Sequence, residues 1–168
     1  MRREREVCDF RRACLEWRNV DDAVMGGVSR SSLTIRDDGH AEFSGEVSLE
    51  RNGGFASVRT TLELRDYSSY DRFRIRVRGD GRRYSFRVRN DERFDGVVYA
   101  GDFITAAGAW QEIDLPFSAF RPLFRGQAVI GVPPMDPGNV VQIGFLISSR
   151  QEGPFCLEVE WIRAGRVF

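Results

Sequence analysis

The sequence predicts an all-β fold of the sandwich or barrel class. About ten short segments alternate apolar and polar residues with a period of two, the pattern of strands that have one face in a core. Segments containing Gly and Pro separate them, as turns separate the strands of sandwiches and barrels. With 168 residues and a hydrophobic share of 42%, the chain has the size of one domain and enough apolar side chains for a core.

The chain divides into a short N-terminal segment and one domain. Residues 1–13 are mostly charged, and we expect a loose tail or a short helix there. Residues 14–168 contain the alternating patterns without an internal repeat, so we expect a single β-sandwich domain. In chain order, the expected strands are 30–36, 41–50, 54–64, 73–78, 83–89, 96–104, 110–115, 139–148 and 157–161.

The clearest pattern lies in the middle of the chain. Apolar residues alternate with arginines over 73–78, and the alternation resumes over 83–89. Between them, Gly79-Asp80-Gly81 suits a tight turn that needs positive φ. We therefore predict a β-hairpin, which in register would place seven arginines on one outer face: Arg72, Arg74, Arg76, Arg78, Arg83, Arg87 and Arg89.

Seven like charges on two neighbouring strands would repel one another, so something must compensate them. One interpretation is pairing with acids on adjacent strands, and exposed pairs of that kind contribute about 0–1 kcal/mol each. The other interpretation is a surface that accepts anions, such as acidic protein segments or a polyanion. The acids available for the first interpretation are Glu42, Glu46, Glu50, Glu158 and Glu160.

The overall charge argues against bulk nucleic-acid binding. The chain has 25 basic and 25 acidic residues, and every basic residue is Arg. A nucleic-acid-binding domain usually has a strongly basic balance. Arg is also the better bidentate partner for carboxylates, which is compatible with an arginine-rich recognition surface as well as with a compositional bias of the genome.

The cysteines and the N-terminus suggest a compartment. The chain has an odd number of cysteines and no CxxC pair: Cys8, Cys14 and Cys156. We therefore expect neither a disulfide framework nor a zinc site. A reducing compartment is the simplest environment for such a chain. The first residues lack the apolar run of a signal peptide, and no segment is long and apolar enough for a membrane helix. We expect a cytoplasmic, bacterial protein without membrane insertion.

Catalytic motifs are weak. His40, the single histidine, follows Asp37-Asp38-Gly39 and is expected to be a solvated turn residue. Nucleophile-elbow, Walker and zinc-protease motifs are absent from the sequence. An enzyme would need an acid pair such as Asp95 and Asp102 in a cleft, with one raised pKa. We expect no catalytic residues.

Neither a cofactor nor a metal ligand set is evident. Asp21-Asp22 and Asp37-Asp38 are adjacent carboxylates, but neither pair has the spacing of a calcium loop. A structural calcium held through backbone carbonyls is the one alternative that the sequence leaves open.

One aromatic segment between strands is a candidate interface. Residues 115–126 contain three Phe, two Pro and two Arg, and aromatic and Arg side chains are the usual anchors of interfaces. A half-buried capping loop is an equally good interpretation, and 116–120 could begin a helical turn. The tryptophans Trp17, Trp110 and Trp161 lie in apolar strand patterns and are expected in the core, although exposed ones could stack on sugars.

Several separated blocks resemble one family. The run from Trp17 to Ser29 resembles the opening signature of the complex I intermediate-associated protein 30 family, and 53–59 resembles its second block. Residues 70–89, 110–126, 143–145 and 153–158 are similar to later blocks in the same order. The resemblance covers about 14–164 and implies a galactose-binding-like jelly roll related to carbohydrate-binding modules. It also implies a non-catalytic role in assembly, since mitochondrial members hold partly built membrane-arm intermediates of NADH:ubiquinone oxidoreductase.

We therefore expect an assembly factor or chaperone whose partners are proteins, subunits of a membrane complex, with no nucleic acid. A carbohydrate-binding module is the alternative function, and the mitochondrial matrix is the alternative compartment if a targeting segment has been removed. The candidate partner-binding residues are Asp21, Asp22, Met25, Arg72, Arg74, Arg76, Arg87, Phe117, Phe120, Arg121, Phe124 and Arg125.

Overall fold

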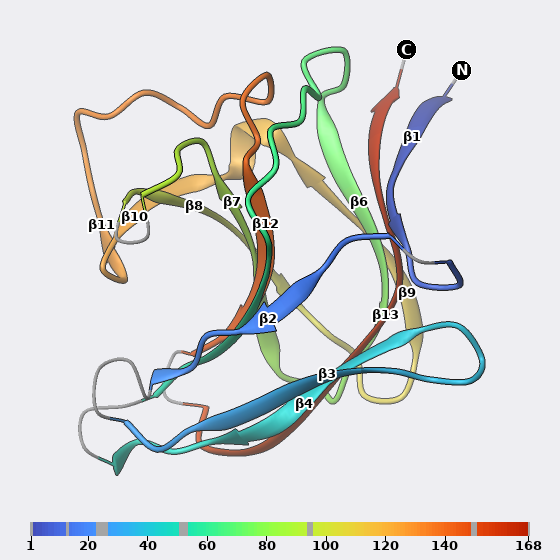
Figure 1. Cartoon of the computed structure of the whole chain (residues 1–168), viewed down its shortest axis with the longest axis vertical. Coiled ribbons are helices and arrows are strands. Elements are labelled where there is room, and N and C mark those ends of the chain that lie inside the picture. The colour runs from blue at the N-terminus through green and yellow to red at the C-terminus, as the bar shows by residue number, and fades with distance from the viewer. Residues whose placement is uncertain are drawn as a thin grey trace.

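The computed structural model describes residues 2–12, 14–22, 27–50, 54–93, 96–148 and 151–167 (Figure 1). Two antiparallel sheets pack face to face in this part of the chain, which confirms the predicted all-β sandwich. Sheet A has the order β3-β4-β13-β6-β9, and β1 pairs with β13 beyond the end of β4. Its strands are β1 (Arg2–Asp9), β3 (Arg30–Ile35), β4 (Ala41–Val47), β6 (Arg72–Arg78), β9 (Trp110–Pro116) and β13 (Gly153–Val167).

Sheet B forms the second layer, in the order β11-β10-β8-β7-β12-β5-β2. A short 3₁₀ turn at Phe117–Ala119 connects β9 of sheet A to β10 of sheet B, where the sequence suggested a helical turn. The strands of sheet B are β2 (Trp17–Asn19), β5 (Ala56–Thr60), β7 (Arg83–Arg89), β8 (Val98–Ile104), β10 (Arg121–Phe124), β11 (Gln127–Ala128) and β12 (Gln142–Ile147).

The core lies between the sheets and is rich in phenylalanine. Phe73 of β6 and Phe86 of β7 are fully buried, and their ring centroids lie 5.2 Å apart across the two layers. Phe145 of β12 packs on Phe86 with centroids 5.3 Å apart. Full burial of such a side chain contributes about 1.5–3 kcal/mol. The alternation that places these rings inward places the intervening polar side chains on the outer faces.

The predicted hairpin over 73–89 is wrong, although both of its strands exist. β6 lies in sheet A and β7 in sheet B, so the turn at Gly79-Asp80-Gly81 carries the chain from one layer to the other. Period-two alternation shows which side chains face the core, but strands of opposite layers alternate in the same way as hairpin partners. The arginines of β6 and β7 therefore lie on opposite outer faces of the sandwich.

The N-terminal tail or helix predicted over 1–13 is also wrong. Residues Arg2–Asp9 form β1, which pairs antiparallel with the second half of β13. The strand pattern was hidden because the outward positions hold charges that are paired in the fold: Glu4 forms ion pairs with Arg74 of β6 and Arg163 of β13.

A disulfide joins Cys8 to Cys14, whose Cα atoms are 5.4 Å apart, so the expectation of no disulfide is wrong. The chain turns back after β1, and this turn brings together two cysteines that sequence spacing alone does not pair. Cys156 is the free thiol. Separately, none of the helical structure in the described ranges is long and apolar enough to cross a membrane.

Candidate partner-binding face

The outer face of sheet B carries a row of arginines that runs across its strands. The register pairs Arg18 with Arg59, Arg59 with Gly144, and Gly144 with Arg87. It continues from Arg87 to Ala100 and from Ala100 to Arg121. We call Arg18, Arg59, Arg87 and Arg121 the arginine row. Together with Arg83 and Arg89 of β7, which project from the same side, they make up the arginine face.

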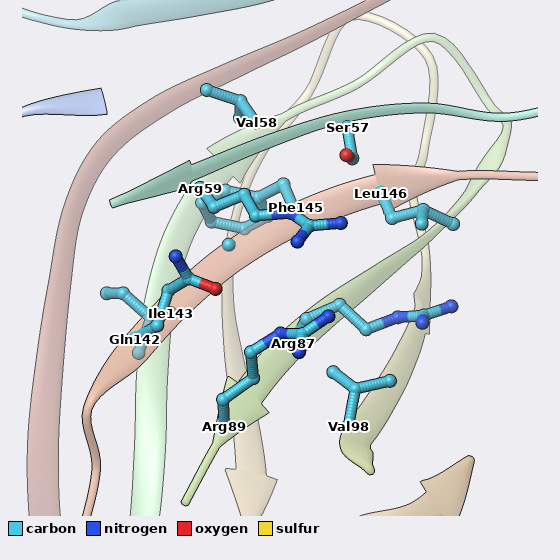
Figure 2. Close-up of a pocket in the computed structure, with 11 residues that line it drawn as sticks. Ser57, Val58, Arg59, Arg87, Arg89, Val98, Gln142, Ile143, Phe145 and Leu146 are labelled. Atoms are coloured by element: carbon cyan, nitrogen blue, oxygen red, sulfur yellow. The ribbon is translucent and has the colours of Figure 1, made fainter. Parts of the chain in front are cut away.

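Two hollows lie along this face. The first has a volume of about 40 Å³ and lies over Gly144, with Arg59, Arg87, Arg89 and Gln142 around it. Figure 2 shows the arginine side chains approaching this hollow from β5 on one side of β12 and from β7 on the other. A methyl group at Gly144 would come within 2.5 Å of the Val58 carbonyl oxygen, so the backbone itself requires glycine here.

The second hollow is larger, about 230 Å³, and lies beside the first. Arg83, Arg87, Arg121 and Asp102 line it, together with residues of β10 and β11. Arg87 and Leu146 line both hollows and so connect them. The two hollows form one shallow path across the strands, along the direction of the arginine row.

Burial and neighbouring arginines act on the charged state of Arg59 and Arg87 in the arginine face. Burial, and then repulsion from Arg89, Arg18 and Arg87, lowers the pKa of Arg59 to about 10. Burial also lowers the pKa of Arg87 to about 10, against the attraction of Asp102. Asp102 is the one carboxylate among the described residues that line the hollows. Both arginines stay protonated near neutral pH, so their charged state carries an energetic cost that a bound anion would relieve.

The individual side chains are held in place by local contacts. Arg87 Nε donates to Ser85 Oγ at 2.8 Å, and Arg89 Nη1 donates to the Arg93 carbonyl at 2.7 Å. Arg121 Nη2 lies 2.5 Å from Asp102 Oδ2. These contacts orient the guanidinium groups of Arg87, Arg89 and Arg121.

The arginines of β6, on the opposite face, are paired with acids. Arg76 pairs with Glu160 at 2.7 Å and Arg78 with Glu158 at 2.5 Å, as the pairing interpretation predicted. Arg74, which is buried, lies between Glu4 and Asp114, and Arg72 contacts Asp71 and Asp114. Glu42 pairs with Arg36 instead of a β6 arginine. Arg72, Arg74 and Arg76 are thus stabilising elements of sheet A, and the anion-accepting interpretation moves to sheet B.

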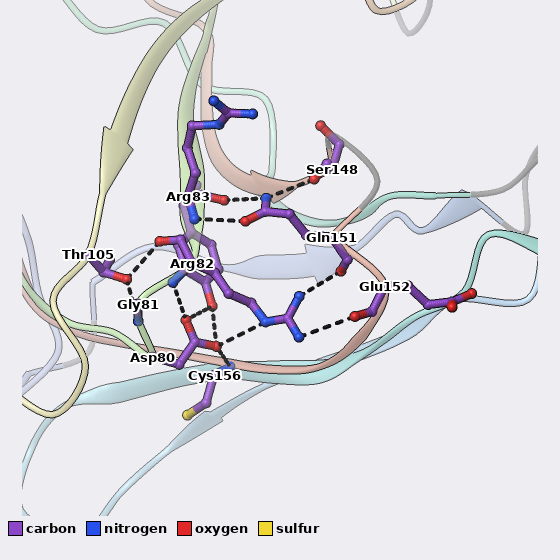
Figure 3. A network of polar contacts seen from close by, with 10 residues as sticks. Asp80, Gly81, Arg82, Arg83, Thr105, Ser148, Gln151, Glu152 and Cys156 are labelled. Carbon is purple, nitrogen blue, oxygen red and sulfur yellow. Dashed lines mark hydrogen bonds and ion pairs between the residues drawn. The ribbon is translucent and has the colours of Figure 1, made fainter.

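A polar network behind the second hollow ties the two sheets together (Figure 3). Asp80 accepts hydrogen bonds from the Tyr84 hydroxyl at 3.0 Å, from the Arg82 backbone at 3.1 Å and from the Cys156 backbone at 2.8 Å. Burial is the main cause that raises the pKa of both Tyr84 and Cys156, the latter to about 11. Tyr84 and Cys156 belong to different sheets, so the Asp80 carboxylate fixes the crossing from β6 to β7.

The same network positions one end of the arginine face. The Gln151 side chain accepts from the Arg83 backbone at 2.9 Å and donates to the Arg83 carbonyl at 2.8 Å. Arg82 donates to the carbonyls of Gln151 and Glu152. The backbone on both sides of the second hollow is therefore held by paired polar groups.

The predicted Asp21–Ser29 loop is a structural loop in its described part. Asp22 is 1% exposed and accepts from the Ser29 backbone and hydroxyl and from the backbone of Gly54 and Phe55. Burial alone would raise its pKa, but these hydrogen bonds outweigh burial and hold the pKa below its usual range. Asp22 is therefore not available to a partner. Asp21 accepts hydrogen bonds from the Ser31 hydroxyl and the Ser57 backbone. Met25 lies outside the described residues.

The aromatic segment 115–126 is divided between core and surface. Phe120 is 7% exposed and Phe117 is half-buried, and both pack against Phe73, with ring centroids at 6.1 and 4.9 Å. Phe124 is 41% exposed, and the guanidinium of Arg125 lies 5.3 Å above its ring. Among the candidates in this segment, Phe117 and Phe120 cap the core, and Arg121 joins the arginine face.

His40 differs from its prediction as a solvated turn residue. It is 6% exposed, with Nδ1 2.5 Å from Asp38 and Nε2 2.8 Å from Glu158, and its ring packs edge-on against Trp110 at 5.5 Å. The covering residues come from β9 and β13, which local sequence around a turn cannot reveal. One member of the acid pair considered for catalysis, Asp95, lies outside the described residues. In the described ranges, no group of three or more His, Cys, Asp or Glu side chains is placed to hold a metal ion.

The sequence analysis named Arg87 and Arg121 of this face and did not name Arg18, Arg59 and Gly144. These residues lie on strands that are distant in the chain, and register across a sheet is set by pairings that alternation does not encode. The available signal was an arginine at an outward position of β2, β5, β7 and β10.

Comparisons place the chain among known proteins. Residues 8–159 match the family model for Complex I intermediate-associated protein 30. The chain is 29% identical over 180 residues to "Complex I intermediate-associated protein 30, mitochondrial" of Mus musculus, covering 95% of this chain and 53% of that protein. The protein of that name from Drosophila melanogaster is 26% identical over 88% of this chain and 57% of its own length. The chain thus spans about half the length of these relatives.

A solved structure shares the fold. The family 11 carbohydrate-binding module of a Clostridium thermocellum cellulosomal cellulase superposes with a TM-score of 0.73, covering 96% of this chain and 93% of the module. The sequence identity is 19%, so this similarity concerns the jelly-roll fold alone.

Proposed function

Because this chain belongs to the complex I intermediate-associated protein 30 family, we propose that it is a non-catalytic binding protein that acts as an assembly factor for a membrane protein complex. Its client would be NADH:ubiquinone oxidoreductase or another respiratory complex, and its contact surface the arginine face. The observation that carries this proposal is the gathering of five arginines around the two hollows of sheet B, where Asp102 is the one acid among the described lining residues: Arg59, Arg83, Arg87, Arg89 and Arg121.

The mechanism follows from differential affinity. An incomplete complex exposes segments that its missing subunits will later cover, and charged segments among them need a temporary partner. The arginine face gathers several guanidinium groups around two hollows, so a carboxylate-bearing segment would meet more than one cationic donor there. When the final interface forms, it competes for the same segment and releases the assembly factor.

The names of the relatives include the word mitochondrial, which supports a mitochondrial compartment over the bacterial cytoplasm. Both localisations stay predictions, as does the absence of a cofactor or bound calcium.

A carbohydrate-binding module, the alternative function, has less support. Sugar platforms use exposed aromatic rings, and the described residues at the outward positions of β5, β7, β8 and β12 include no aromatic side chain. Trp110 lies on the other sheet, under the guanidinium groups of Arg76 and Arg78.

Affinity purification from detergent-solubilised membranes of the native host tests the proposed function. The wild-type chain should recover respiratory subunits, and the triple variant Arg59→Gln, Arg87→Gln, Arg121→Gln should lose them. A charge-matched control, Arg12→Gln, Arg30→Gln, Arg36→Gln, changes three exposed arginines elsewhere and should recover them as the wild type does. Recovery of no membrane-complex subunit by the wild type would overturn the proposal.

A further inference from the structure

We propose that the free edge of β9 binds an extended segment of another protein, which adds to sheet A as a further strand. The segment would carry basic side chains at alternate positions on the outer face and apolar side chains on the core side. This inference concerns the sheet opposite to the arginine face, so it goes beyond the proposed function and does not depend on it.

The backbone of β9 is paired on one side only. β9 is the last strand of sheet A beside β6, and the Phe117 amide continues their ladder by donating to the Asp71 carbonyl at 2.9 Å. Opposite residues of antiparallel strands alternate between hydrogen-bonded and non-hydrogen-bonded pairs. Three residues therefore direct their backbone polar groups away from β6, to the free edge: Trp110, Glu112 and Asp114. Within the described ranges, these edge-facing groups form no hydrogen bond.

The edges of sheet B and the far edge of sheet A offer less. β11 and β2, the edges of sheet B, have two and three residues. β3, at the far edge of sheet A, is linked to β2 by a hydrogen bond of 2.8 Å from the Asn19 side chain to Ser31 Oγ. A strand edge that is both long and uncovered is a template for pairing with another chain, and β9 has seven residues.

β1 is the other long edge strand, with eight residues, and it is protected. Arg5 pairs in register with Ala164, a core residue, and its guanidinium lies 5.3 Å from the centroid of the Tyr67 ring. Charged side chains at inward positions discourage the pairing of edge strands, because an added strand would have to bury them. The inward positions of β9 that pack on the core hold apolar side chains instead, Ile113 and Leu115.

The outer side chains of β9 favour a basic segment. Glu112 and Asp114 are exposed on the outer face, and opposite charges on facing strands attract each other. β6 already meets β9 in this way, with Arg74 opposite Asp114 and Arg76 opposite Glu112. Arg76 pairs with Glu160, however, and Glu112 forms no ion pair within the described ranges, so its carboxylate is available to a new strand.

The core side of the same edge is apolar. Ile113 packs against the core but is only half-buried, because no strand lies beyond it in the sheet. An apolar residue of the added segment beside Ile113 would extend the core by one position. The β9 of a second copy is a poorer occupant, since antiparallel pairing centred on Glu112 would place two like charges opposite each other. The pattern that fits is the one that β6 shows, basic and apolar residues in alternation.

Fluorescence anisotropy with labelled synthetic peptides tests the inference. The first peptide, Lys-Val-Arg-Ile-Arg-Val-Lys, alternates basic and apolar residues, and the second has the same composition with its basic residues in one block. We expect the alternating peptide to bind at least ten-fold more tightly than the block peptide. Backbone N-methylation at its two arginines, whose amides would face β9, should weaken binding at least ten-fold. Backbone N-methylation at its two valines, whose amides would face away from β9, should change binding less than two-fold.

Variants of the chain test the edge itself. Glu112→Pro removes an N–H group that faces the free edge, and proline is tolerated on an edge strand when its nitrogen faces solvent. We expect this variant to keep the fold and to bind the alternating peptide at least ten-fold more weakly. Glu112→Arg should weaken binding similarly through its charge, whereas Glu46→Arg, at an exposed position of β4, should leave it unchanged. Circular dichroism and thermal unfolding of each variant would show that the fold is kept.

Hydrogen exchange of the wild-type protein is a measurement that needs no variant. The amides of Glu112 and Asp114 should exchange fast in the free protein and at least ten-fold more slowly with the alternating peptide bound. Slow exchange of both amides in the free protein, equal binding of the alternating and block peptides, or tight binding of the peptide methylated at its arginines would each overturn the inference. Recovery of respiratory subunits without peptide binding would overturn this inference and leave the proposed function standing, and peptide binding without recovery of subunits would do the reverse.

Discussion

Arg59 and Arg87 pair with Gly144 from opposite sides, so two guanidinium groups disfavoured by burial and by neighbouring charge line one hollow. Most charged residues of this chain are arranged differently. On sheet A, each of the β6 arginines has a carboxylate within ion-pair distance. The two outer faces therefore differ: sheet A pairs the β6 arginines with acids, and sheet B gathers arginines around a hollow.

Replacement of Arg87 by Met should therefore stabilise the protein. The change removes a like charge next to Arg59 and Arg89 and keeps much of the side-chain volume, and relief of one like-charge pair contributes about 0.2–1 kcal/mol. Thermal unfolding should show a melting temperature higher by about 1–4 °C for a chain of this size. Arg78→Met is the matched control, because Arg78 donates two hydrogen bonds to Glu158 and its loss should lower the melting temperature. A decrease of equal size in both variants would contradict the interpretation of the arginine face.

Gly144→Ala should destabilise the fold and disturb the first hollow together. The new methyl group would lie 2.5 Å from the Val58 carbonyl oxygen, so β5 and β12 must separate, at a cost of about 1–3 kcal/mol. Urea unfolding measures this cost. Gly138→Ala is the control, because the nearest atom there is the Asp136 carboxylate oxygen at 3.2 Å, which can rotate away. Equal stability of the two variants would show that the close approach at Gly144 is not required.

Asp80→Asn should weaken the junction between the sheets. An amide offers one acceptor oxygen where the carboxylate serves Tyr84, Arg82 and Cys156, so at least one buried donor loses its partner, at about 1–3 kcal/mol. Tyr84→Phe, which removes one donor and leaves the carboxylate, should cost less. Hydrogen exchange of the Cys156 amide would locate the effect, and an unchanged exchange rate in Asp80→Asn would refute the assignment.

Acid should reduce stability through Asp9. Its side-chain hydrogen bonds from Arg11 lower its pKa from 3.8 to about 2. A carboxylate with a lowered folded-state pKa stabilises the fold above its unfolded pKa, and this contribution is lost as the pH falls from about 4 to about 2. The free energy of unfolding, measured by urea titration, should fall less steeply over this range in Asp9→Asn than in the wild type. Parallel pH profiles would exclude the Asp9–Arg11 pair as a source of acid sensitivity.

The sequence was informative wherever a property is local. Alternation located the strands of the core, and the turn at 79–81 was placed correctly because glycine at Gly81 has φ of 89°. Alternation could not show that the turn crosses between layers, because that depends on the hydrogen bond between Asp80 and the distant Cys156. The disulfide was missed for a related reason, since it depends on how the chain turns after β1.

The predicted arginine surface is divided between the two sheets. The sequence indicated an arginine surface and named Arg87 and Arg121, but it added the β6 arginines, which the fold pairs with Glu158, Glu160, Asp114 and Glu4. Which acid lies beside a given arginine depends on which strands are neighbours in the sheet. Arg18 and Arg87 are 69 positions apart in the chain, and sheet pairings through Arg59 and Gly144 bring them into one row.

The pairing of Arg2 with Val167 has a practical consequence for how such a module can be attached to other sequence. The two ends of the described chain emerge side by side at one corner of sheet A (Figure 1). Additional polypeptide joined there would start from sheet A, the layer that does not carry the arginine face. We therefore expect that an affinity tag or a further domain can be fused at either terminus, or at both, without covering the surface that is proposed to bind the client.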